Sequence, residues 1–201
     1  MPDLREITAS IRDRLDDKEK ARETVLQSTR QIVRNCRSAI ACIQTGSDPS
    51  ADLANARNCY LSLRKTFERY PDFFYSGYAM AAQQELAEAE ILKSVIIKRE
   101  IATSEEIGVS DEAFVLGLAD AIGEMRRIFL QLLLKDEIDE AKVILNKMED
   151  FFSILMTFDY PDALLPAKRK QDVARSLLEK CRSELVMTMQ MLRLREELRG
   201  K

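Results

Sequence analysis

Residues 113–123 read AFVLGLADAIG. The run is apolar except for Asp120, a composition typical of a helix with most of its surface buried. Ser110 stands just before the run as a good N-cap, and two acidic residues follow it in the first turn, where negative charge stabilises a helix. The sequence therefore predicts a largely buried helix over residues 111–134, with a lone carboxylate inside its apolar run.

Apolar residues recur at three- or four-residue spacing on both sides of this stretch, which is the period of an α-helix. The chain holds six Gly and five Pro among 201 residues, too few for the many turns of a sandwich, a barrel or an α/β fold. The other helices that we expect cover residues 3–45, 51–69, 72–101, 137–156 and 167–198. The pattern predicts one all-α domain over residues 1–201, a bundle of six to seven helices, several of them long.

The chain has no histidine. Every mechanism that rests on an imidazole base is therefore excluded, as are zinc sites with histidine ligands. The Glu-x-x-His sites of di-iron helical bundles are excluded for the same reason. Metal-assisted hydrolysis is the metal chemistry that remains open.

The cysteines and the N-terminus indicate a cellular compartment. Four cysteines lie at spacings unlike a paired CxxC zinc site, and we expect reduced thiols in a reducing cytoplasm. Residues 1–14 are too highly charged for a signal peptide, and no apolar run approaches the ~20 residues that span a bilayer. We expect a soluble cytoplasmic protein without a membrane partner.

Two pairs of acidic residues interrupt apolar helix faces. Glu85 and Glu88 lie at i, i+3 spacing in the helix expected over residues 72–101, so they are neighbours one turn apart. Asp120 and Glu124 lie at i, i+4 spacing in the helix over residues 111–134 and are also one turn apart. Gly117 and Gly123 flank Asp120 and would let another backbone or a ligand come close.

These four carboxylates would repel one another in one crevice unless a cation lay between them. An all-oxygen ligand set favours Mg²⁺ or Mn²⁺ over zinc. The alternative is structural: the carboxylates form a solvated face, or they pair with Arg126 or Arg127. The pattern leaves both interpretations open.

Basic residues form a second group. They lie along the first long helix and at the start of the last one, at Lys18, Lys20, Arg22, Arg30, Arg34, Arg37, Lys168, Arg169 and Lys170. Such rows can follow a phosphate backbone, although a row of charge at helical spacing is also typical of a solvated face. We assign the nearby aromatic run at residues 73–78 to the core rather than to base stacking.

Long helices in a chain of this size suggest association. A first helix of about forty residues can leave one face uncovered by its own chain, and such bundles often finish burying it by oligomerising. Adaptable apolar surface near the C-terminus would suit an interface, and it consists of Met187, Met189, Met191, Leu192 and Leu194. An intramolecular core stripe is the equally good alternative.

Two motifs carry a family resemblance. Residues 84–89, QELAEA, are similar to the QExxEA helix of translin-associated factor X (TRAX). Residues 116–127, LGLADAIGEMRR, resemble its LGxADxxGExxR stretch. The helix order agrees over most of the chain, and the likeness is closer to the catalytic TRAX branch than to translin. The long insertion that eukaryotic members of that branch carry between the motifs is absent, which implies a compact prokaryotic-type homologue.

The resemblance implies a translin-type helical bundle that assembles into a hollow homo-oligomer around nucleic acid. It also implies a Mg²⁺-dependent endoribonuclease site whose catalytic and metal-binding residues are Glu85, Glu88, Asp120 and Glu124. Arg127 matches the family's arginine and would position the site or a phosphate, and Arg22 resembles a translin nucleic-acid contact. We add Lys168, Arg169 and Lys170 as RNA-binding residues.

Our leading hypothesis is an endoribonuclease in which carboxylate-held Mg²⁺, or Mn²⁺, activates water to cut short RNA inside a homo-oligomer. The basic rows would hold single- or double-stranded RNA with little sequence specificity. The alternative is a non-catalytic, translin-like protein that binds RNA or DNA, single-stranded DNA included. A third possibility is a helical scaffold whose carboxylates are ion-paired.

Overall fold

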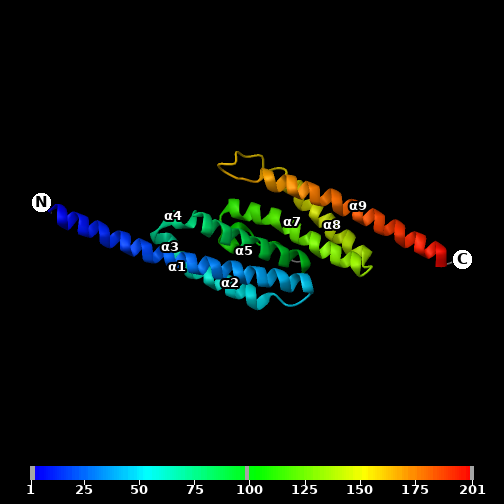
Figure 1. Ribbon diagram of the computed structural model, residues 1–201, viewed down its shortest axis with the longest axis horizontal. Helices are drawn as coiled ribbons and strands as arrows, with labels where there is room; N and C mark the ends of the chain where they lie inside the picture. Colours follow the sequence, from blue (N-terminus) through cyan, green and yellow to red (C-terminus); the bar gives the residue numbers. More distant parts are fainter. Residues whose placement is uncertain (1–2, 98–99, 200–201) are drawn as a thin grey trace.

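The computed structural model describes residues 3–97 and 100–199, which fold into helices joined by short connections (Figure 1). Within these residues there is no β-strand, so the all-α prediction is confirmed. The six long helices are α1 (Leu4–Thr45), α2 (Ser50–Ser62), α5 (Gly77–Ile96), α7 (Asp111–Leu134), α8 (Ile138–Leu155) and α9 (Lys168–Arg199). Three short helices, α3 (Arg64–Arg69), α4 (Pro71–Phe74) and α6 (Ser104–Ile107), lie between them.

Two predicted helices are each divided in the structure. The helix expected over residues 51–69 turns at buried Leu63, whose amide bonds to the carbonyl of Tyr60 in a tighter i→i−3 turn. The helix expected over residues 72–101 is interrupted at Ser76, which has an extended backbone and whose hydroxyl donates to the carbonyl of Phe73. Such a side-chain bond competes with helix continuation.

The start of α7 is fixed as the sequence predicts. The hydroxyl of Ser110 accepts a hydrogen bond from the amide of Ala113, and α7 ends at Leu134. The backbone amide of Ser110 also donates to the side chain of Gln83, whose own amide group donates to the carbonyl of Phe74. The fully buried Gln83 thus ties α5 to the beginning of α7.

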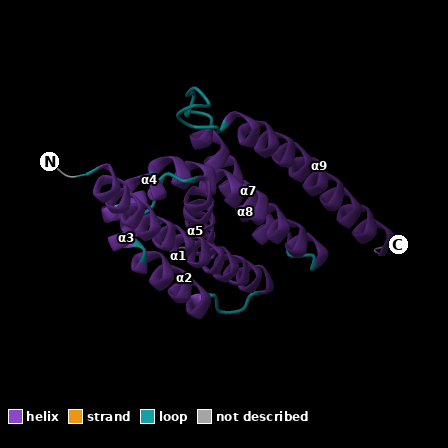
Figure 2. Cartoon of the chain, turned by 60° about the vertical axis from the view of Figure 1, so that its left-hand side comes forward, coloured by secondary structure: helices purple, strands orange, loops and turns teal. Residues whose placement is uncertain are grey.

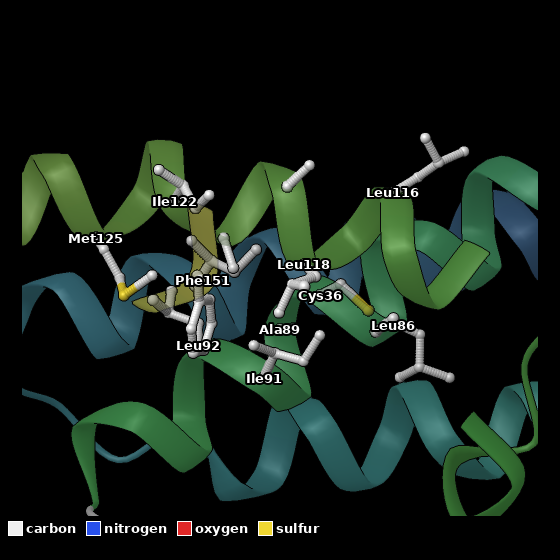
Figure 3. Packing of buried hydrophobic residues seen from close by; sticks show 14 of the residues in the cluster. Cys36, Leu86, Ala89, Ile91, Leu92, Leu116, Leu118, Ile122, Met125 and Phe151 are labelled. Atoms are coloured by element: carbon white, nitrogen blue, oxygen red, sulfur yellow. The ribbon is translucent and has the colours of Figure 1, made fainter. Parts of the chain in front are cut away.

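The helix α7 is the centre of the bundle. It packs on α5 on one side and on α8 and α9 on the other, and α5 packs in turn on α1, which carries α2 on its outer side (Figures 1 and 2). The core runs along the α5–α7 contact (Figure 3), where Leu86, Leu92, Ile122 and Met125 are fully buried. This packing sets the faces of α5 and α7 that carry the acidic motifs against each other.

The first half of α1 and the second half of α9 extend beyond the bundle at opposite ends (Figure 1). Their apolar side chains are exposed, and they include Leu4, Ile7, Ile11, Leu15, Met187, Met191, Leu194 and Leu198. Of the predicted C-terminal group, Met187, Met191 and Leu194 are exposed and Met189 and Leu192 are half-buried, so none of the five lies in the buried core. No helix in the described ranges is both long and apolar enough to span a bilayer.

Two smaller predictions concern the cysteines and the aromatic run at residues 73–78. All four cysteines are free thiols, with Cys36 and Cys181 buried. Of the aromatic run assigned to the core, Phe73 is buried, whereas Tyr75 is exposed because it lies at the turn between α4 and α5.

Candidate active site

The helices α5 and α7 are in very close contact at Gly117. A β-carbon added there would lie 2.8 Å from the carbonyl oxygen of Gln84 and 2.9 Å from the amide nitrogen of Glu88. Only glycine fits at such a distance from another backbone, which confirms the expected close approach at Gly117. Asp120 follows Gly117 by one helical turn, so the contact brings the two acidic motifs together. Gly123 instead faces α9, with the side chain of Leu177 4.0 Å from where a β-carbon would be.

Glu88 lies at the centre of the acidic residues. Its side chain is buried, with a residue exposure of 8%. Burial, and then the negative charges of Asp120, Glu85 and Glu124, raise the pKa of Glu88 to about 8, while Lys170 acts in the opposite direction. The structure therefore gathers all four predicted carboxylates into one electrostatically coupled cluster, hereafter the acidic cluster.

Asp120 is held by two donors from different helices. The ammonium group of Lys170, in the first turn of α9, pairs with one carboxylate oxygen. The side-chain amide of Gln84 on α5 donates to the other. Asp120 is therefore the point at which α5, α7 and α9 meet.

Glu85 and Glu124 also have basic partners. The guanidinium of Arg37 on α1 lies 2.9 Å from Glu85. Arg127 lies 3.4 Å from Glu124, which also accepts a hydrogen bond from Gln44 at the end of α1. Burial raises the pKa of Glu124, and its charge interaction with Arg127 opposes that rise.

The structure settles which arginine serves the acidic cluster. Arg127 pairs with Glu124, as the structural alternative allowed. Arg126 instead faces α9 and lies 2.9 Å from Glu184. One arginine of the pair therefore belongs to the cluster, and the other joins two helices.

Glu88 differs from the other three carboxylates. Within residues 3–97 and 100–199 its carboxylate has no hydrogen-bond or ion-pair partner, and the charge of Lys170 alone opposes the effect of burial on its pKa. A buried carboxylate without a donor calls for a proton or a cation. The all-oxygen donor set around it has the chemistry that Mg²⁺ or Mn²⁺ prefers.

The acidic cluster is not arranged as a finished metal site. In the described part of the chain, no three acidic or thiol side chains lie close enough together to hold an ion. The carboxylates of Asp120, Glu85 and Glu124 turn instead toward their basic partners. The donor chemistry therefore fits a divalent cation, and the present side-chain positions fit bound ammonium and guanidinium groups.

The predicted RNA-binding residues lie in different surroundings in the structure. Lys170 reaches into the acidic cluster, whereas Lys168 and Arg169 of the same turn are exposed. Arg22 is exposed beside Glu23, 3.2 Å away, and lies roughly 22 Å from Arg37 along α1 at 1.5 Å per residue.

A shallow hollow lies along the basic row of α1. It has a volume of about 450 Å³ and is lined by Thr29, Arg30, Val33, Arg34 and Arg37. Arg37, at one end of this row, also pairs with Glu85 of the acidic cluster.

Sequence reasoning missed three functions of side chains. It did not assign Gln84 or Gln44 to the cluster, and it placed Arg37 in the basic row of the first helix rather than on Glu85. Gln84 had a signal, because it belongs to the QELAEA motif. Gln44 and Arg37 had none, since their contacts join segments far apart in the sequence.

The sequence was compared with protein-family models and with known proteins. No protein-family model matches the chain. An uncharacterized protein of Methanocaldococcus jannaschii is 34% identical over 188 residues, which cover 92% of this chain and 84% of that protein.

Solved structures are similar over nearly the whole chain. The structure of AfC3PO with duplex RNA has a TM-score of 0.83 and 31% identity, covering 93% of this chain and 98% of that one. The crystal structure of AfC3PO has a TM-score of 0.84, 32% identity and the same coverage. The fold alone is shared with apo-NeC3PO, at a TM-score of 0.82 and 19% identity over 94% of this chain and 98% of that one.

The order of the helices and the α5–α7 contact at the acidic motifs define a translin-type helical protein. C3PO, from Archaeoglobus in the first two structures and Nectria in the third, is the translin/TRAX complex. At this identity and coverage, the chain belongs to the translin/TRAX family.

Proposed function

We propose that this protein is a divalent-cation-dependent endoribonuclease that cuts short RNA. The observation that carries the proposal is Glu88, a buried carboxylate without a donor beside three further carboxylates. Such a cluster is unfavourable in a purely structural role, because buried negative charges repel one another and lose their hydration. A function that binds a cation explains why four acidic residues are placed together.

The residues that would hold the ion are Glu85, Glu88, Asp120 and Glu124. A Mg²⁺ or Mn²⁺ ion bound there would lower the pKa of a water molecule and offset negative charge on the phosphoryl oxygens. Glu88 would supply the innermost oxygens, and Gln84 would keep the carboxylate of Asp120 in place from α5. Arg37 and Arg127, at the exposed edge, would contact the phosphates on either side of the cut.

RNA is the proposed partner for two reasons. AfC3PO, which is 31% identical over 93% of this chain, has been solved in complex with duplex RNA. The hollow on α1 is lined by three arginines that can contact phosphates, and one of them, Arg37, also pairs with Glu85 of the acidic cluster. We therefore propose binding through the phosphate backbone, with little sequence specificity.

We also propose that the active form is a homo-oligomer. The apolar side chains on the projecting ends of α1 and α9 are exposed in the single chain. Exposed apolar rows of this length are typical of protein interfaces. Light scattering coupled to size-exclusion chromatography would give the mass of the assembly, and a monomer at micromolar concentration would contradict the proposal.

The decisive experiment is cleavage of a short labelled RNA in Mg²⁺ and in EDTA. We expect cutting in Mg²⁺ only, and we expect Asp120→Asn to abolish it while RNA binding and assembly persist. Asp139→Asn is the matched control, because Asp139 is exposed on α8 and pairs with Lys142. An Asp120→Asn protein that cuts at the wild-type rate would refute the site.

A second candidate function is binding of RNA or DNA without cleavage. The observation that favours it is that Asp120, Glu85 and Glu124 already have basic partners, so most of the cluster is balanced without an ion. The two functions differ in their need for a divalent ion. Pure binding weakens with salt and is unchanged by EDTA.

A further inference from the structure

Lys170 is the basic side chain that reaches furthest into the acidic cluster. Its side chain and that of Asp120 are each 29% exposed, whereas Arg37 and Arg127 are 70% and 65% exposed. Lys170 also acts on Glu88, whose pKa it lowers. The ammonium group therefore contacts Asp120 and also acts electrostatically on Glu88.

The position of Lys170 is not one that helix stability favours. It lies in the first turn of α9 together with Lys168 and Arg169, and that turn holds no acidic residue. A helix N-terminus carries a partial positive charge, so basic residues in the first turn are unfavourable. Residues that break a local rule of this kind are most often found at functional sites.

The start of α9 is nevertheless fixed firmly. The side-chain amide of buried Gln171 donates to the carbonyls of Leu155 and Phe158, each at 2.9 Å. These two bonds join the first turn of α9 to the end of α8 and hold Lys170 opposite Asp120. The contact is therefore a built feature of the fold rather than a chance meeting of surface charges.

An ammonium group and a divalent ion on the same oxygen of Asp120 would repel each other strongly. Gln84 holds the other oxygen, so an ion that binds Asp120 competes with the ion pair to Lys170. Arg37 and Arg127 need not move in the same way, because they approach Glu85 and Glu124 from the solvent side.

We propose that Lys170 is a built-in competitor of the divalent cation, occupying Asp120 in the metal-free protein and leaving it when the ion binds. This rests on the metal site proposed above. Lys170 is thus a positioning residue for Asp120 in the empty site. It lowers the affinity of the cluster for free cations, and its release leaves an unpaired ammonium group at the edge where a phosphate would arrive.

The test compares Mn²⁺ binding by wild type, Lys170→Met and Lys168→Met in isothermal titration calorimetry, without RNA and at 150 mM salt. Both variants lose one positive charge from the same helical turn, but only Lys170 contacts Asp120. At this salt, long-range charge effects are largely screened for the exposed Lys168. We expect Lys170→Met to bind Mn²⁺ about tenfold more tightly than wild type, and Lys168→Met to bind as wild type does.

If Lys170 only joined α7 to α9, Lys170→Met would have a lower melting temperature and would bind Mn²⁺ as wild type does or more weakly. That result would overturn the proposal. Absence of Mn²⁺ binding in all three proteins would instead refute the metal site itself. If the methionine variant does not fold, Lys170→Gln makes the same comparison, because it keeps a donor for Asp120 without the charge. Lys170→Arg, which keeps the charge, is expected to bind Mn²⁺ as weakly as wild type.

Discussion

The α-carbon of Gly117 faces the backbone of Glu88 so closely that a β-carbon on it would lie 2.9 Å from the Glu88 amide nitrogen. Gly117→Ala would therefore push α5 away from α7, since backbone atoms cannot turn aside as a flexible side chain can. We expect the variant to lose about 1 to 3 kcal/mol of unfolding free energy. Thermal unfolding followed by circular dichroism would measure the loss.

Gly123→Ala is the matched control for this prediction. It lies on the same helix, and its β-carbon would be 4.0 Å from a flexible leucine side chain, which is ordinary contact. Alanine is also the better helix former by about 1 kcal/mol, so we expect unchanged or higher stability. Equal melting temperatures for the two variants would show that the α5–α7 contact at Gly117 is looser than described.

The raised pKa of Glu88 predicts that the stability of the metal-free protein depends on pH. Its pKa is about 8 when folded and near 4.5 when unfolded. Between these values the folded state keeps a proton that the unfolded state has released, so the free energy of unfolding falls as pH rises from about 4.5 to 8. The fall is on the order of 5 kcal/mol for a shift of this size. Urea unfolding in EDTA at several pH values would measure it.

Glu88→Gln removes this titration. We expect the variant to show a flatter pH profile and to be more stable than wild type at pH 8, whereas Glu68→Gln, at an exposed position, keeps the wild-type profile. Added Mg²⁺ would stabilise wild type more at pH 8 than at pH 5, because the ion needs the ionised carboxylate. A profile of Glu88→Gln that follows wild type would show that Glu88 titrates near its ordinary pKa.

The sequence predicted the fold well where local signals were strong. The bounds of α7 agree with the prediction because Ser110 caps one end. The helix α1 ends at Thr45 because Gly46 follows it with a φ of 76°. The turn at Leu63 was missed because no Gly or Pro marks it. Its only local signal is Ser62, whose hydroxyl donates to the carbonyl of Cys59. The interruption at Ser76 had a weak signal, since serine favours helix starts.

The site was predictable to a similar extent. Spacing alone places Glu85 beside Glu88 and Asp120 beside Glu124 on their own helices, and the structure brings the two pairs together. The basic partners were beyond reach of such reasoning, because Lys170 is 50 residues from Asp120 and Arg37 is 48 residues from Glu85. Only tertiary packing decides which charge meets which carboxylate.

The ion pair of Arg57 with Glu90 predicts a large difference between two arginine variants. Glu90 is buried on α5 and is paired with Arg57 of α2. Arg57→Met leaves that carboxylate buried and uncompensated, so we expect a loss of about 2 kcal/mol or more of unfolding free energy. Arg64→Met removes an exposed pair with Glu68 and is expected to change stability by less than about 0.5 kcal/mol. Similar unfolding midpoints in urea would contradict the role of Arg57.

Salt dependence of RNA binding tests where the RNA lies. Each lost phosphate contact reduces the slope of log affinity against log salt by about 0.7 to 0.9. We expect the double variant Lys168→Gln, Arg169→Gln to reduce the slope by the amount of roughly two phosphate contacts. Arg22→Gln is expected to reduce the slope by the amount of roughly one contact. Lys142→Gln is the control, because Lys142 pairs with Asp139 on α8. Fluorescence anisotropy with a labelled RNA in EDTA gives the slopes without cleavage.

These slopes separate two paths for the RNA. Arg22 lies roughly 22 Å from Arg37 along α1, so its contribution requires RNA to run along the first half of that helix. A slope changed at Lys168 and Arg169 alone would confine the RNA to the side of the acidic cluster formed by α9. If all variants keep the wild-type slope, the basic rows are solvated faces, and the phosphate contacts must lie elsewhere.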